Sequence, residues 1–268
     1  MDIKLVAIDI DGTLLNEKHQ LAQATIDAIQ AVRQRGIKVV LCSGRLLSGV
    51  QPYLDQLAIS GNDEFAITFN GAMAQTLSGD VLVHHTLDYD DFLETEMLSR
   101  KFGVHFQLET IDTIYATNRD LSPYTIGESY LVRLPVKYRA PEDISKDLVI
   151  SKVMMIDDPK LIANANNGIS DELRNKLYIV QSEPFFIEIM SKQANKGKTL
   201  GELATKLGLT ADNVMALGDQ ENDLTMIKYA GLGVAMGNGI KAVKDAATFT
   251  TKPNTENGVA YALKKYLL

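Results

Sequence analysis

Short apolar runs alternate with helix-compatible segments at the start of this chain, and this alternation restricts its fold more than any other feature. The run KLVAID at residues 4–9 is followed by a helical stripe of apolar residues from Leu21 to Val32. The runs IKVVLC at 37–42 and FAITF at 65–69 come next, separated by a second helix-compatible segment. Strands and helices in alternation predict right-handed crossovers and a parallel sheet.

The same rhythm returns near the C-terminus, whereas the middle of the chain differs. Apolar runs at 213–218 and 231–236 are each followed by a helix-compatible segment. Strand candidates with irregular spacing fill the interval, at 79–85, 104–108, 113–117, 152–157, 177–180 and 185–190. We therefore predict an α/β fold with a Rossmann-like parallel-sheet core formed by residues 1–85 and 188–268. Residues 86–187 are predicted to form an inserted α+β domain.

The composition excludes several classes of protein. With 268 residues, 46% of them hydrophobic, the chain can form one large domain or two small ones. A net charge of −7 argues against a nucleic-acid partner, because phosphate backbones are bound by basic surfaces. The single cysteine, Cys42, excludes an intramolecular disulfide and fits a reducing compartment. The sequence shows no basic leader and no apolar run of about 18 residues. We therefore expect a cytoplasmic protein without a membrane partner, either a monomer or a homodimer.

Polar residues follow four of the predicted core strands, at the end where ligands bind in open parallel sheets. They are Asp9 and Asp11 after the first strand, Ser43 and Gly44 after the second, Asn70 and Gly71 after the third, and GDQEND, residues 218–223, after the fourth. Carboxylates that converge at one edge raise each other's pKa unless a cation offsets them. Every candidate ligand is an oxygen, and the four histidines show no metal-ligand spacing, so a hard ion such as Mg²⁺ fits best.

Each of these motifs also has a purely structural interpretation. Asp9 and Asp11 fit a turn or a helix cap, and so do the acids of GDQEND. The SGR stretch at 43–45 fits a plain loop before a helix as well as an anion site. NKGKT at 195–199 is not a Walker phosphate loop, because that pattern requires a glycine where Lys192 stands. The recurrence of acids after two strands of similar character favours the functional interpretation.

With DIDGTLL, SGR, NKGKTL and GDQEND in this order, the chain resembles the haloacid-dehalogenase (HAD) superfamily of phosphohydrolases over its whole length. The combination of DxDGT and GDxxND at opposite ends is specific. The single long insertion after the third strand is similar to the type IIB (C2) cap of Cof-type sugar phosphatases. The stretch LGDQENDLTMIKYAGLGVAMGN is similar to their YidA-like branch. The resemblance implies that substrate specificity resides in the inserted domain.

The resemblance also implies roles for the acidic residues. Asp9 would attack phosphorus and form an aspartyl-phosphate. Asp11 would act first as the general acid and then as the general base. Asp9, Asp219 and the backbone carbonyl of Asp11 would hold Mg²⁺, and Asp223 would support the site from the outer shell.

The other motif positions would bind the phosphoryl group and the substrate. The implied phosphate-binding residues are Ser43, Gly44, Lys196 and Asn222. Substrate contacts are implied for Arg45, Asn70 and Gly71, where the family's core meets its cap. Two lysines compete in NKGKT. The family's N-K-G pattern selects Lys196, and Lys198 fits a solvated residue in the first turn of a helix.

Together these features predict a Mg²⁺-dependent phosphatase of small phosphomonoesters, with sugar phosphates as the class that the resemblance implies. Two alternatives stay open. One is a phosphoryl-transferring enzyme similar to sugar phosphomutases, which must exclude water from the aspartyl-phosphate. The other is a non-catalytic phosphate-sensing protein, for which the chain is long and the acid/base Asp11 is superfluous.

Overall fold

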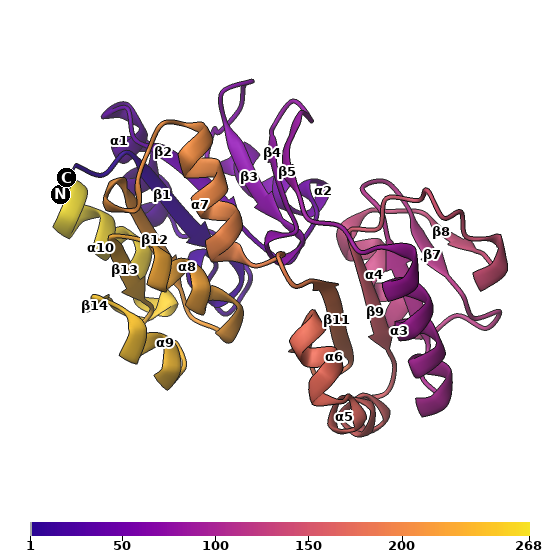
Figure 1. Cartoon of the computed structure of the whole chain (residues 1–268). Coiled ribbons are helices and arrows are strands. Elements are labelled where there is room, and N and C mark those ends of the chain that lie inside the picture. Colours follow the sequence, from indigo (N-terminus) through magenta and orange to yellow (C-terminus); the bar gives the residue numbers. More distant parts are fainter. Residues whose placement is uncertain (1) are drawn as a thin grey trace. The chain divides into compact units, whose positions relative to one another are not determined.

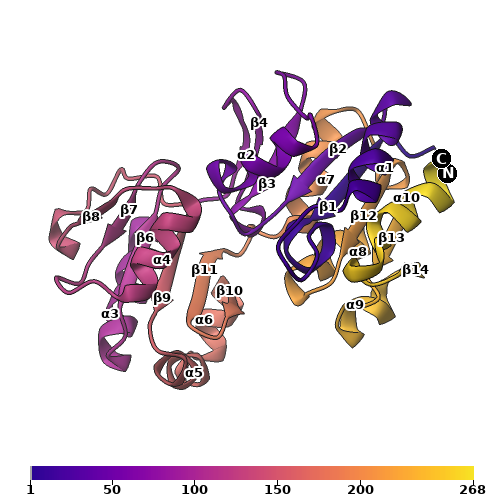
Figure 2. The ribbon, with the colours of Figure 1, turned by 180° about the vertical axis from the view of Figure 1, so that it is seen from behind.

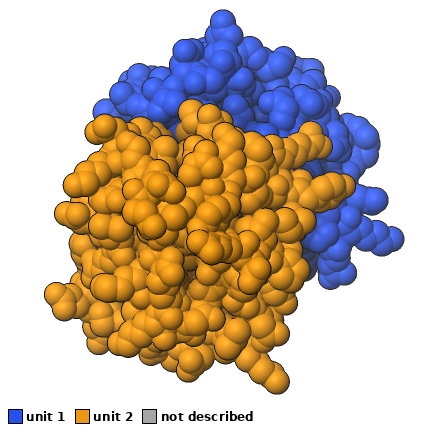
Figure 3. All heavy atoms as spheres, turned by 90° about the vertical axis from the view of Figure 1, so that its right-hand side faces the viewer, with its two compact units in different colours: residues 1–83, 195–268 blue, residues 84–194 orange. Residues whose placement is uncertain are grey.

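The structure, a computed structural model, describes residues 2–268 and divides into two compact units (Figure 1). The first unit runs to Val83 and resumes with Asn195–Leu268, and the second comprises His84–Ala194 (Figure 3). The sequence analysis placed the second boundary at 187/188, whereas the second unit of the structure extends to Ala194 and includes the strand β11 (Phe186–Ser191).

The first unit is built on an eight-stranded sheet with the order β14-β13-β12-β1-β2-β3-β4-β5. The strands from β14 to β3 in this order pair in parallel, and β3 pairs with β4 in antiparallel. Their bounds are β1 Leu5–Asp9, β2 Lys38–Cys42, β3 Phe65–Thr68, β4 Met73–Thr76, β5 Val81–His84, β12 Val214–Gly218, β13 Leu232–Ala235 and β14 Phe249–Thr250. The predicted α/β fold with a parallel-sheet core is confirmed.

Helices cover both faces of this sheet, which explains why its central strands are continuous apolar runs. Figures 1 and 2 show α1 and α7 on opposite sides of the sheet. Val6 and Ile8 of β1 pack with Ile29 of α1 in one cluster, whereas Leu5 and Ala7 pack in another with residues of α7. The helices of this unit are α1 Gln23–Gln34, α2 Leu47–Gln56, α7 Lys196–Lys206, α8 Leu224–Tyr229, α9 Lys241–Ala246 and α10 Gly258–Leu267. Between residues 2 and 268, no helix combines the length and the hydropathy that a membrane crossing requires.

The second unit has a six-stranded sheet with the order β10-β11-β9-β6-β7-β8. Its bounds are β6 Phe106–Glu109, β7 Ile114–Ala116, β8 Val136–Tyr138, β9 Lys152–Ile156, β10 Leu177–Glu183 and β11 Phe186–Ser191, with helices α3 Tyr89–Phe102, α4 Pro123–Val132, α5 Pro159–Gly168 and α6 Asp171–Lys176. Most neighbours are antiparallel, and Phe92, Leu108, Val153 and Ile187 belong to its apolar core. The strands predicted in the middle of the chain all form, whereas β8 is an addition that its short, exposed sequence concealed.

Candidate active site

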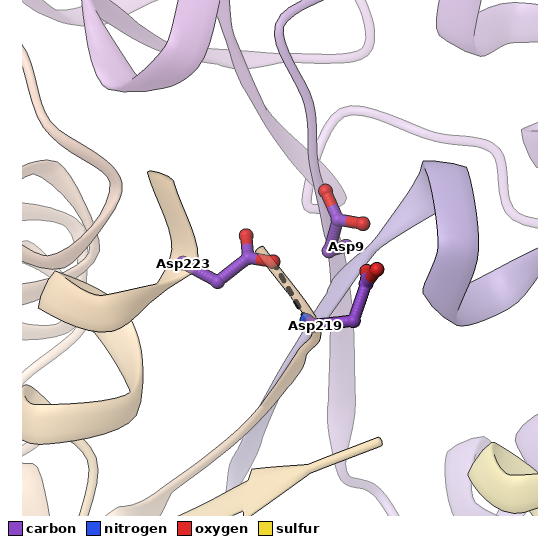
Figure 4. A group of neighbouring side chains, drawn as sticks. All are labelled: Asp9, Asp219 and Asp223. Carbon is purple, nitrogen blue, oxygen red and sulfur yellow. Dashed lines mark hydrogen bonds between the residues drawn. The ribbon is translucent and has the colours of Figure 1, made fainter. Parts of the chain in front are cut away.

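Three buried aspartates lie at the carboxyl ends of two neighbouring strands in the first unit. Asp9 is the last residue of β1, and Asp219 directly follows β12, which pairs with β1 in parallel. One oxygen from each of Asp9, Asp219 and Asp223 lies within 4.8 Å of the others (Figure 4). The parallel register therefore brings together carboxylates that are more than two hundred positions apart in sequence.

Lys196 supplies the cation of this cluster. Its side chain is 0% exposed, and its Nζ donates to Asp9 Oδ1 at 2.6 Å and to Asp223 Oδ1 at 2.7 Å. The side chain of Asn195 caps α7 by accepting from the Lys198 N–H at 2.9 Å, which fixes Lys196 as the first residue of the helix. Lys198 is exposed. The structure thus places Lys196, rather than Lys198, among the aspartates.

Asp223 organises the loop that carries Asp219. Its Oδ2 accepts from the backbone N–H groups of Asp219, at 2.8 Å, and Gln220, at 3.0 Å. A side chain at Gly218 would collide with the Asp223 carboxylate, so the GD pair lets this acid approach closely. Both oxygens of Asp223 are engaged by the protein, Oδ1 by Lys196 and Oδ2 by the two backbone N–H groups.

Burial dominates the electrostatics of the cluster. It raises the pKa of Asp9 well above the ordinary value, and the neighbouring Asp223 adds to this, although Lys196 opposes it. Burial and then Asp223 raise the pKa of Asp219 to about 6. Burial alone would lower the pKa of Lys196, but Asp223 and Asp9 outweigh it and hold the amine as an ammonium. One cation therefore faces three buried carboxylates, an imbalance that a further cation would correct.

The turn after β1 packs against Asp219. Thr13 Oγ1 donates to Asp219 Oδ1 at 2.8 Å, and Asn238 Nδ2 donates to the carbonyl of Gly12 at 2.8 Å. Gly12 has φ +82°, and a Cβ at this position would collide with Asp219 Oδ2. Thr13 is a site residue that the sequence interpretation did not single out, although it is the threonine of the DGT stretch.

Asp11 lies apart from the buried cluster. Its side chain is 47% exposed, and it accepts two hydrogen bonds from Arg45, from Nε at 3.0 Å and from Nη2 at 2.8 Å. His19 Nδ1 lies 3.9 Å from Asp11 Oδ1. Arg45 also lies over the ring of Tyr53, at 5.6 Å from its centroid. The structure therefore pairs the predicted acid/base with one of the predicted substrate contacts.

Ser43 and Gly44 follow β2 at the same edge of the sheet. The buried Ser43 accepts through Oγ from the Arg45 N–H at 3.1 Å, and its carbonyl accepts from the Asn70 N–H at 2.9 Å. A Cβ at Gly44 would press on the Asn70 side chain at 3.0 Å. These contacts join the end of β2 to the end of β3.

Asn222 and Gly71 complete this edge. Asn222 Nδ2 donates to Asn70 Oδ1 at 3.0 Å, which connects the loop after β12 to the turn after β3. A side chain at Gly71 would collide with the backbone of Asn195 and Lys196, so this turn lies directly against the start of α7. All predicted site residues thus converge on one edge of the sheet, with Asp11 and Arg45 at its exposed side.

Comparison with known proteins adds three similarities. The profile of a family described as haloacid dehalogenase-like hydrolase matches residues 6–263. The Bacillus subtilis protein "Putative phosphatase YxeH" is 41% identical over 266 residues, which are 99% of this chain and 98% of the relative. The "5-amino-6-(5-phospho-D-ribitylamino)uracil phosphatase YcsE" of Bacillus subtilis is 33% identical over 270 residues, covering 100% of this chain and 97% of the relative.

A solved structure agrees with these sequence similarities. The crystal structure of a haloacid dehalogenase-like hydrolase from Bacteroides thetaiotaomicron superposes with a TM-score of 0.85 and 29% identity. The superposition covers 98% of this chain and 99% of that chain. The similarity therefore extends over the core and the inserted residues alike.

Proposed function

This chain belongs to the haloacid dehalogenase-like hydrolase family and is an enzyme of the phosphatase type, and from this premise we propose that it is a Mg²⁺-dependent phosphatase of small phosphomonoesters. The proposal rests above all on the buried ammonium of Lys196, which bridges Asp9 and Asp223 beside Asp219. A positive group held between strand-end carboxylates can receive a phosphoryl group and offset its charge.

Asp9 is proposed as the nucleophile. Lys196 holds its Oδ1, and no donor from residues 2–268 occupies its Oδ2, so one oxygen is free to attack phosphorus. A bond forms between this oxygen and phosphorus while the bond from phosphorus to the leaving oxygen breaks, which gives an aspartyl-phosphate. Ser43, the Gly44 amide and Asn222 are proposed to hold the phosphoryl oxygens.

Asp11 is proposed to move the protons. It protonates the leaving oxygen in the first step and takes a proton from the attacking water in the second, roles that contribute about 10²- to 10⁴-fold. Its exposure and its ion pair with Arg45 suit an acid that meets the leaving group at the open side of the site. Arg45 keeps the carboxylate oriented before substrate arrives.

The donor set fits Mg²⁺. Asp9, Asp219 and the backbone carbonyl of Asp11 would hold it, and all are the oxygen ligands that this ion prefers. The glycine at position 12 supports this fit, because its missing side chain leaves room for the Asp219 carboxylate beside the turn. When bound, Mg²⁺ neutralises charge on the phosphoryl oxygens.

Sugar phosphates and related polyol phosphates are proposed as the substrate class. The name of YcsE gives that relative a substrate with a phosphoribityl group, which is a phosphorylated sugar alcohol. We assign recognition of the leaving group to the second unit, residues 84–194, which would act as the cap.

The test is phosphate release from a panel of phosphomonoesters, with Mg²⁺ and with EDTA. Wild type is compared with Asp9→Asn and with Lys198→Ala, a matched change at an exposed position. We expect Mg²⁺-dependent release that falls at least about a thousandfold in Asp9→Asn and is retained in Lys198→Ala. Normal turnover by Asp9→Asn refutes the nucleophile. If nothing is hydrolysed, a phosphorylated Asp9 trapped from acid-quenched protein would point instead to phosphoryl transfer or sensing.

A further inference from the structure

The second unit contains a polar cavity of about 590 Å³ that shares no residue with the aspartate cluster. Its walls come from the C-terminal half of α3, from the segment after β7 and from the chain that follows β8. Because all of these segments lie within residues 84–194, one compact unit forms the whole cavity. Its volume suits a small metabolite.

A buried hydroxyl in the wall lacks a hydrogen-bond partner. Thr117 lines the cavity and is 4% exposed, and within residues 2–268 no group bonds to its Oγ1. A buried polar atom without a partner costs about 1–3 kcal/mol. The oxygen itself is closed to solvent, so a ligand oxygen in the cavity could supply the missing partner only after the Thr117 side chain rotates toward the cavity.

The adjacent Asn118 presents a donor beside this hydroxyl. Its Oδ1 accepts from the Phe106 N–H at 2.8 Å, which fixes the orientation of the amide group. Because the oxygen is used by the backbone, the Nδ2 group is the part of this side chain that remains for a ligand oxygen.

Two arginines, Arg100 and Arg119, and two glutamates, Glu96 and Glu142, are the charged residues that line the cavity. Arg100 uses Nε to donate to Glu96 Oε1 at 2.7 Å, and across the described chain its terminal nitrogens have no partner. Arg119 is exposed, donates a side-chain hydrogen bond to Tyr138 and interacts electrostatically with Glu142. A guanidinium group has five N–H donors, so each arginine keeps donors for a carboxylate or phosphate beside the bond it already makes.

We propose that this cavity is a second ligand site, which binds a small hydroxylated anion. Arg100 and Arg119 bind its phosphate or carboxylate group, Thr117 and Asn118 bind adjacent oxygens, and Glu142 accepts from a hydroxyl. The site stands independently of the phosphatase proposal, since none of its residues belongs to the proposed catalytic machinery.

The test is an NMR titration of the full ¹⁵N-labelled chain carrying Asp9→Asn, which prevents consumption of the probe. The probe is 6-phosphogluconate, which combines phosphate, carboxylate and hydroxyl groups. We expect the amide signals of residues 117–119 and 142 to shift in a saturable manner at millimolar or lower concentration, with a Kd of about 1 mM or below. Glucose 6-phosphate and gluconate, titrated separately, show whether phosphate or carboxylate is the recognised group.

Arg119→Gln is the decisive variant, because its exposed side chain can be changed without disturbing the fold. Affinity should fall about tenfold in Arg119→Gln and stay within about twofold in Lys101→Gln, an exposed residue of α3 outside the cavity. The proposal is overturned if these amides do not shift up to about 10 mM probe, if the shifts are confined to the strand edge around Asp9, or if Arg119→Gln binds as well as its parent.

Discussion

Each unit of this protein buries one lysine among three carboxylates, yet the two clusters differ in their place in the fold. In the first unit Lys196 contacts Asp9 at 2.6 Å and Asp223 at 2.7 Å, with Asp219 alongside. In the second unit Lys152 contacts three glutamates, Glu188 at 3.1 Å, Glu109 at 3.4 Å and Glu128 at 3.7 Å. Composition and burial alone do not distinguish the two.

Backbone position does distinguish them. Asp9 and Asp219 stand where parallel strands end, so their carboxylates occupy the edge at which open sheets bind ligands. Glu109 and Lys152 instead face each other across two antiparallel strands, and Glu188 comes from the third. The cluster of the second unit therefore joins three strands of one sheet to the α4 helix, which carries Glu128, and none of its residues stands at the end of a parallel strand.

Removal of each lysine should separate catalysis from stability most clearly. Lys196→Met is expected to lower kcat/KM at least about a thousandfold, because Asp9, Asp223 and the phosphoryl group lose the buried ammonium that bridges them. Lys152→Met should leave kcat within about threefold. Phosphate release under saturating Mg²⁺ measures the activity of both variants. Equal loss of kcat in the two folded variants would contradict the distinction.

Lys152→Met should act on stability. It leaves three buried carboxylates without a cation, which is expected to lower the free energy of unfolding by about 3–5 kcal/mol. The measurement is urea unfolding monitored by hydrogen exchange of the β9 amides. Adding Glu109→Gln and Glu188→Gln to the same protein should restore a large part of the loss, because the uncompensated charge is then removed. If the variant with all three changes recovers no stability, the loss in Lys152→Met comes from packing and not from the uncompensated charge.

Two glycines with positive φ give a matched test of the first cluster. Gly12 has φ +82° and lies against Asp219, whereas Gly36 has φ +78° and a Cβ added there would meet no atom within 4 Å. Gly36→Ala should cost about 1 kcal/mol of stability and no activity. Gly12→Ala should cost more than this and also weaken Mg²⁺ activation, since it displaces the Asp219 carboxylate. The measurement is phosphatase activity as a function of Mg²⁺ concentration. If Gly12→Ala and wild type reach half-activation at the same Mg²⁺ concentration, the turn has no part in the metal site.

The smallest expected effect is a pH dependence in the second cluster. Burial raises the pKa of Glu109 from 4.5 to about 7, despite the opposing Lys152. The folded state therefore keeps a proton that the unfolded state releases, and the stability from this group, present below about pH 4.5, is lost as the pH rises through about 7. Relative to wild type, Glu109→Gln should become more stable between about pH 5 and pH 8. Thermal unfolding at several pH values measures this, and parallel curves would exclude the titration of Glu109.

Much of the candidate active site was predictable because its residues follow local sequence patterns. Asp9 and Ser43 each follow an apolar run, so the rule that parallel strands end at one edge was sufficient to group them. The choice of Lys196 over Lys198 depended on a motif, and the Asn195 cap supplies its physical reason. The pairing of Asp11 with Arg45 could not be predicted, since it depends on how two loops approach each other.

The sequence by itself determined the strand and helix rhythm, the interruption by an inserted unit and the acidic ends of the core strands, because apolar periodicity and strand-end chemistry are local properties. Only the tertiary structure decided which groups meet. Strand register placed Glu109 opposite Lys152, and turn geometry placed Thr13 on Asp219. Long-range pairing of this kind follows from the packing of whole elements, which no single segment of sequence encodes.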